Sequence, residues 1–159
     1  MSRKYCINPM LFIMGVFLCC FKANAQEKQD ECKHMIDSAI KLKYALLQKA
    51  PGKNDNYLEN LYLLNEQDQP LNYLNSSNKF KFIRVYGNQS RKILAKGIYA
   101  WKVFTTLNQN QFTIKIIEFY ITYKNHNYSF GNGGGSKTIF EFDCNQHKWL
   151  MLSSENSGL

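Results

Sequence analysis

Residues 111–124, QFTIKIIEFYITYK, carry an apolar pattern that decides the fold class. Successive side chains of a strand point to opposite faces, so a period of two identifies this segment as β-strand. Its apolar residues change phase half-way along, and no regular strand can hold them all on one side. The sequence therefore predicts either a β-bulge near Ile116-Ile117 or a strand that is apolar on both faces. The first phase consists of Phe112, Ile114 and Ile116, and the second of Ile117, Phe119, Ile121 and Tyr123.

Further strands are expected on both sides of this segment. Residues 97–107, GIYAWKVFTTL, are joined to it by Asn108-Gln109-Asn110, a polar turn that predicts a hairpin. The same period of two recurs in four other segments, which are 79–86, 127–130, 136–144 and 147–152. Together they predict a bent antiparallel β-sheet of about five to six strands.

A helix is expected before the sheet, over residues 27–50, and Pro51-Gly52 should end it. Charges of both signs lie between its apolar positions, which favours a helix that covers a core over one that lies on a membrane surface. A short helix capped by Asp55 is expected next, over residues 57–62. The predicted fold class is α+β, with an N-terminal amphipathic helix packed on the sheet. The apolar stripe of the first helix consists of Cys32, Met35, Ile36, Ala39, Ile40, Leu46 and Leu47.

Residues 131–138, GNGGGSKT, differ by one residue from the phosphate-binding loop G-x-x-x-x-G-K-[ST]. That loop needs glycine at its sixth position, so that backbone N–H groups wrap the phosphates, and it needs a helix to follow. Here the sixth position is Ser136, and the residues after Lys137 have the period of a strand. The sequence therefore predicts no binding of ATP or GTP.

We expect the glycine stretch to form a wide loop or a bulged strand exit, where glycine adopts positive φ at low cost. Residues without side chains also let a ligand or a partner approach the backbone closely. Candidate ligand-binding residues in this stretch are Gly133, Gly134, Gly135 and Lys137.

The first 25 residues have the pattern of a signal peptide. Arg3 and Lys4 precede an apolar run over residues 10–21, and Ala23-Asn24-Ala25 provides a cleavage site before Gln26. The run is too short for a membrane span, which takes about 20 residues. We expect residues 26–159 to form a single secreted or periplasmic domain. Its net charge is +5, because 17 basic and 12 acidic residues remain after removal of the signal.

Cys32 and Cys144 are the cysteines that remain after cleavage. A pair of cysteines in an exported chain predicts a disulfide, with two buried thiols as the alternative. A disulfide between these two positions would close most of the domain into one loop. In chain-entropy models, a loop of this length contributes roughly 4 to 5 kcal/mol to stability.

No catalytic constellation is recognisable, and no catalytic residue, metal ligand or cofactor is assigned. His34, His126 and His147 are scattered, and no G-x-S-x-G or H-E-x-x-H motif occurs. Glu118 is the candidate for a polar role, because it interrupts the apolar run of the central strand; a bulge there would turn it to water. Trp101 and Tyr120, on the central hairpin, are the aromatic candidates for ligand binding.

Basic residues are concentrated between positions 79 and 96, and aromatic residues lie near them in the sequence. Such patterns occur in nucleic-acid-binding proteins. Export and the modest net charge argue against nucleic acid, and favour a solvated face or an acidic partner.

The order of elements, a helix followed by long bent strands, resembles the cystatin-like fold that includes nuclear-transport-factor-two-like domains. The ending GGGSKTIFEFDCNQHKWLMLSS is also similar to endings of small secreted proteins of Bacteroidetes-type bacteria. The resemblance implies a fold that serves enzymes, ligand carriers and interaction modules alike.

Three functions therefore remain open at this stage. The first is a non-enzymatic exported module that binds a protein or a small molecule. The second is an immunity or inhibitor protein that acts on a toxin, and the third is a small hydrolase or isomerase with a cone-shaped cavity. A homodimer is also an open alternative, since aromatic residues are abundant.

Intact mass checks the export and disulfide predictions together. Under non-reducing conditions we expect the mass of a chain that begins at Gln26 and lacks two hydrogens. Retention of residues 1–25 would contradict cleavage. Reaction of Cys32 and Cys144 with a thiol reagent, in protein unfolded without reductant, would contradict the disulfide.

Overall fold

The computed structural model describes residues 9–49, 55–72 and 74–157, and side chains within these ranges except those of 9–28, 55 and 56. The chain divides into two compact units, Met1–His34 and Met35–Leu159. Helix α1 (Pro9–Lys49) begins in the first unit and ends in the second. The start of the predicted signal peptide and the predicted helix end at Pro51-Gly52 lie outside the described residues. Cleavage before Gln26 stays a prediction.

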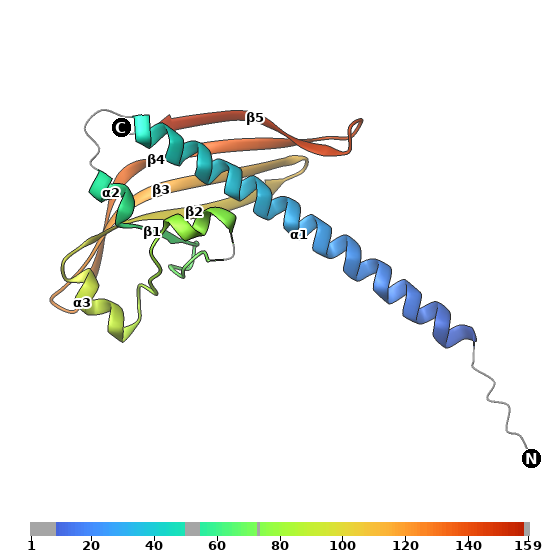
Figure 1. Cartoon of the computed structure of the whole chain (residues 1–159), viewed down its shortest axis with the longest axis horizontal. Helices are drawn as coiled ribbons and strands as arrows, with labels where there is room; N and C mark the ends of the chain where they lie inside the picture. Colours follow the sequence, from blue (N-terminus) through green and yellow to red (C-terminus); the bar gives the residue numbers. More distant parts are fainter. Residues whose placement is uncertain (1–8, 50–54, 73, 158–159) are drawn as a thin grey trace, which may run out of the picture. The chain divides into compact units, whose positions relative to one another are not determined.

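The second unit has an α+β fold, in which a curled sheet of five strands follows the helix (Figure 1). The strands lie side by side in chain order. Their bounds are β1 Leu61–Leu64, β2 Ile98–Asn108, β3 Gln111–Lys124, β4 Asn127–Asp143 and β5 Lys148–Ser157.

The sheet is mixed, and the prediction of an antiparallel sheet was wrong for one strand pair. Strand β1 runs parallel to β2, whereas β2 to β5 form antiparallel neighbours. Parallel neighbours need a long connection between them. Residues 65–97 supply it, and they contain the short helices η1 (Asn75–Lys79), η2 (Asn88–Ser90) and α3 (Arg91–Leu94).

The predicted strand over residues 79–86 lies within this connection and was wrong. Its single ladder contact is an isolated bridge between Lys81 and Tyr62. Ile83 and Val85 are buried while Arg84 is exposed. The segment therefore covers the sheet with alternate side chains, which gives the periodicity of a strand without a paired strand.

The short helix expected over residues 57–62 was only partly right. Helix α2 spans Asp55–Glu59, and the chain then enters β1, whose four residues are all buried.

The central hairpin agrees with the sequence prediction, because β2 and β3 pair from Ile98–Ile121 to Asn108–Gln111. The β3–β4 register shifts between Ile117 and Phe119, but the extra residue lies in β4, because Ile117 pairs with Gly135 and Phe119 with Asn132. Strand β3 itself pairs with β2 without a shift, so the bulge predicted in β3 was wrong and the alternative, a strand apolar on both faces, was right. Phe112, Ile114 and Ile116 are buried on one face, and Ile121 belongs to a second core cluster on the other.

Residues 35–49 of α1 lie over the face of the sheet that carries Trp101. Buried side chains recur there at intervals of three or four residues, as expected for a helix packed on one side. The ammonium of Lys43 lies 5.1 Å from the centroid of the Trp101 ring. The buried residues of this segment are Met35, Ile36, Asp37, Ala39, Ile40, Lys43 and Leu47.

Asp37 joins α1 to the connection between β1 and β2. Its carboxylate accepts a hydrogen bond of 2.7 Å from the backbone N–H of Ser76. It also forms an ion pair with the ammonium of Lys41, at 2.7 Å. Burial acts to raise the pKa of Asp37, but the hydrogen bonds from Lys41 and Ser76 outweigh it and lower that pKa. The charged carboxylate therefore holds helix and connection together.

The glycine stretch is part of β4, so a wide loop was wrong, whereas a bulge is present: β4 has an extra residue between Asn132 and Gly135, and Gly134 has a positive φ of 102°. Strand β4 continues from Asn127 to Asp143, and the residues after Lys137 remain strand, as predicted. A Cβ atom on Gly135 would lie 2.8 Å from the carbonyl oxygen of Ile116, and one on Gly133 would lie 3.4 Å from Glu118 Cγ. Glycine therefore allows β4 to run close to β3 where the register shifts.

We expect Gly135→Ala to lower the free energy of unfolding by about 1–3 kcal/mol, because the added methyl group meets backbone that cannot move aside. Gly131→Ala is the matched control in the same strand, since its Cβ would have neighbours at 3.8 and 4.0 Å, an ordinary contact. Urea unfolding of both variants measures the difference. Equal losses in the two variants would contradict this account of the close approach.

Candidate functional site

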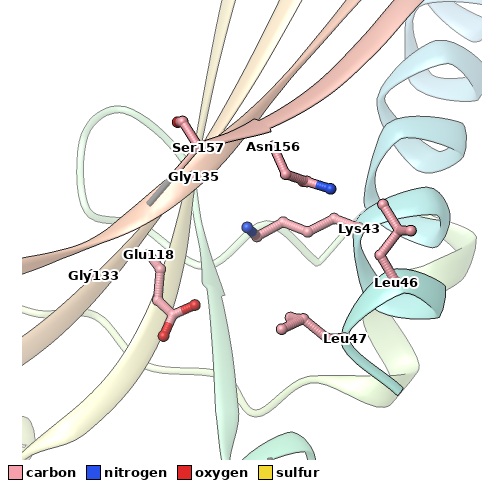
Figure 2. Close-up of a pocket in the computed structure, with 8 residues that line it drawn as sticks. All are labelled: Lys43, Leu46, Leu47, Glu118, Gly133, Gly135, Asn156 and Ser157. Atoms are coloured by element: carbon pink, nitrogen blue, oxygen red, sulfur yellow. The ribbon is translucent and has the colours of Figure 1, made fainter. Parts of the chain in front are cut away.

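A small polar cavity lies between α1 and the sheet in the second unit (Figure 2). Its volume is about 20 Å³. A cavity of this size has room for about one water molecule. We call it the Glu118 cavity, and its lining residues are Lys43, Leu46, Leu47, Glu118, Gly133, Gly135, Asn156 and Ser157.

Two opposite charges face this cavity. Lys43 extends from α1 toward the sheet and Glu118 extends from β3 toward the helix (Figure 2). Lys43 is 5 % exposed and Glu118 is 8 % exposed. The expectation that a bulge would turn Glu118 to water was therefore wrong. The register places Glu118 opposite Trp101, on the sheet face that α1 covers. Burying either Lys43 or Glu118 without the opposite charge of the other would be costly.

Tyr57, on α2, approaches the same group of residues. Burial raises the pKa of Tyr57 strongly, and a hydrogen bond and the charge of Glu118 raise it further. Its ring also packs edge-on against Tyr99, with a centroid distance of 5.0 Å. The phenol is therefore held neutral beside the carboxylate.

The Glu118 cavity is lined by a carboxylate and an ammonium, and the phenol of Tyr57 lies beside the carboxylate; such groups can exchange protons. Its volume leaves no room for an organic substrate beside them, because ligand pockets commonly measure about 300–1,000 Å³. Among the described residues no group of three His, Cys, Asp or Glu side chains could hold a metal ion. The geometry therefore fits a structural polar centre better than a binding pocket.

The structure brings together only some of the residues selected from the sequence. Glu118, Gly133 and Gly135 line the Glu118 cavity, whereas Gly134 and Lys137 do not. Trp101 is fully buried beneath Lys43, so it is unavailable to a ligand.

Tyr120 lies apart from the Glu118 cavity, near the start of β2. It packs on Tyr99 with ring centroids 5.0 Å apart and fills space that a side chain at Gly97 would occupy. Sequence reasoning missed Lys43, although a signal existed. Lys43 follows Ala39 and Ile40 at helical spacing, which places it within the buried stripe.

A second concave feature lies on the β4–β5 hairpin, and we call it the hairpin groove. Its volume is about 510 Å³, and it is lined by Glu141, Phe142, Asp143, Cys144, Asn145, Leu150, Met151 and Leu152. Three consecutive residues of β5 are exposed there, Leu150 by 39 %, Met151 by 48 % and Leu152 by 58 %. Sequence reasoning missed the groove. A run of three apolar residues that does not alternate was the available signal.

Strand β5 is an edge of the sheet, and among the described residues it pairs only with β4. The other edge strand, β1, is partly covered by single bridges from Lys81 and Pro70. Unpaired backbone groups along an edge are a template for another strand. The hairpin groove therefore adjoins an open edge.

The two cysteines carry free thiols in the structure, with Cys32 half-buried and Cys144 exposed. Burial raises the pKa of the Cys32 thiol, and the charge of Glu31 raises it further. The cysteines belong to different units, so the disulfide stays a prediction.

Comparison with known proteins found no matching family model, no matching curated protein and no matching solved structure. The resemblance to cystatin-like and nuclear-transport-factor-two-like domains stays a prediction. Among the described residues, no helix has the length and apolar character that a membrane crossing needs.

Tyr57 predicts a loss of stability at alkaline pH. Its pKa is higher in the folded than in the unfolded chain, so the folded state keeps a proton that the unfolded state loses above about pH 10. Its contribution is complete below that pH, and stability falls by up to about 1.4 kcal/mol per pH unit above it. Urea unfolding between pH 8 and about pH 11.5 should show this fall, and Tyr57→Phe should reduce it.

The matched control is Tyr120→Phe, which alters an exposed phenol on β3. This control should leave the alkaline loss as steep as in the wild type. An unchanged slope in Tyr57→Phe would show that the phenol of Tyr57 ionises as readily in the folded state as in the unfolded state.

Proposed function

We propose that this chain is an exported, non-enzymatic module that binds another protein through the β5 edge and the hairpin groove. The observation that carries the proposal is the exposure of Leu150, Met151 and Leu152 on an edge strand. In this proposal, α1 is the amphipathic helix that covers one face of the sheet with residues 35–49.

Edge strands bind extended segments of other proteins by main-chain hydrogen bonds, and side-chain contacts add specificity. Natural proteins usually protect such edges with charges or proline. In β5 the segment from Trp149 to Ser154 contains neither, and charged residues stand only at Lys148 and Glu155. An unprotected apolar edge of this kind favours a partner chain.

The alternatives receive less support from the geometry. A carried small molecule or a substrate would need an interior cavity, and the Glu118 cavity holds about 20 Å³. An immunity or inhibitor protein is a special case of the present proposal, with a toxin as the partner. No observed side-chain arrangement selects a toxin over other proteins.

Affinity capture with paired variants tests the proposal. The protein is immobilised, exposed to an extract of its source cells, and treated with an amine cross-linker that reaches Lys148. We expect a retained protein whose cross-links map to Lys148, and whose binding Leu152→Lys weakens by about tenfold or more, since central apolar contacts dominate interfaces.

Leu107→Lys is the matched control, because Leu107 is 63 % exposed and Leu152 is 58 % exposed, but Leu107 lies at the β2–β3 turn. It should leave capture unchanged. Equal losses with both variants, or retention of a small molecule alone, would overturn the proposal.

A further inference from the structure

The partner at the β5 edge can be specified by its chemistry. We propose that it is a second copy of this chain, with β5 of each copy paired antiparallel about a two-fold axis at Met151. Two five-stranded sheets then form one continuous sheet. The inference rests on the function proposed above and names the partner of the same edge.

The bulge in β5 sets the register of this pairing. Met151 pairs with Phe140 of β4 and Ser153 pairs with Ile139, so Leu152 is the extra residue of the register shift. With Leu152 left out of the ladder, three residues of β5 stand on each side of Met151. They are Lys148, Trp149 and Leu150 before it, and Ser153, Ser154 and Glu155 after it.

A two-fold axis perpendicular to the sheet requires that opposed residues lie on the same face. Leu150 and Ser153 pair with Glu141 and Ile139, both odd-numbered residues of β4, so they share one face. Leu150 of one copy therefore lies opposite Ser153 of the other. Without the bulge the residues at this spacing would lie on opposite faces. The bulge therefore fixes which residues of the two copies are opposed, Leu150 with Ser153 and Lys148 with Glu155.

Charge follows the same symmetry. Lys148 pairs with Asp143, and Glu155 pairs with Lys137, so both lie on that same odd-numbered face of β4. In the two-fold pairing, Lys148 of one copy lies opposite Glu155 of the second copy, and the pair occurs twice. Opposite charges on facing strand residues are stabilising, and like charges there are destabilising. A shift of register by two residues would lose both pairs.

The uncharged centre lies between the two charge pairs. Met151 meets its own copy, and Leu152 and Leu150 add apolar surface near the axis, where all three residues are exposed. The Glu118 cavity, which α1 lines together with β5, reaches β5 at Asn156 and Ser157, outside the paired segment.

Molar mass measured by sedimentation or light scattering, over a range of micromolar concentrations, tests this pairing. The purified protein should form a dimer. Lys148→Glu and Glu155→Lys should each weaken it by roughly tenfold or more, because each places like charges opposite one another twice. The exposed Lys124, at the end of β3 and outside β5, provides the control Lys124→Glu, which changes net charge as much as Lys148→Glu and should leave the dimer intact.

Rescue separates a specific contact from a folding defect. A mixture of the Lys148→Glu chain and the Glu155→Lys chain should form a heterodimer, since both opposed pairs then carry opposite charges. The double variant K148E/E155K should form a homodimer of wild-type strength. The pairing would be overturned if neither the mixture nor the double variant formed a dimer. It would also be overturned if Lys148→Glu and Glu155→Lys dimerised as strongly as the wild type.

The two proposals can fail separately. A protein that stays monomeric at all concentrations, yet captures a different protein through Leu152, would overturn self-pairing and leave the proposed function standing. A monomer that captures no protein at all would overturn both.

Discussion

The close approach of β4 to β3 at the bulge in β4 is the constraint on which the rest of the fold depends. Gly135 permits it, because any side chain there would meet the carbonyl oxygen of Ile116. The bulge lets β4 pass Glu118, which the regular alternation of β3 places on the face beneath α1, where Lys43 supplies the opposite charge. A glycine stretch and a buried lysine far apart in the sequence therefore serve one place in the structure.

The two faces of the sheet are covered by different segments of the chain. Residues 35–49 of α1 and Phe80 of the connection pack on the face that carries Trp101. The later part of the connection covers the other face, with Ile83, Val85 and Leu94 in its core cluster. Strand β5 lies at the margin of the sheet with Leu150, Met151 and Leu152 exposed.

The sequence predicted those parts that local pattern decides. The hairpin of β2 and β3 follows from alternation within one segment and was confirmed, as was a strand β3 that is apolar on both faces. The bulge lies in the glycine stretch of β4 and not in β3. Residues 79–86 were misjudged, because pairing or covering a sheet is decided by distant neighbours. Lys43 was missed although its helical spacing places it in the buried stripe, because the opposite charge of the Glu118 cavity lies on another element.

The strand order has a consequence for how the chain folds. Strands β2 to β5 are neighbours in both sequence and space, so they can assemble through successive short turns at a low cost in loop closure. Strand β1 and α1 can dock only on a partner that appears later in the chain. The N-terminal part can therefore complete its packing only after the C-terminal meander exists, so the first residues in the chain are among the last to find their place.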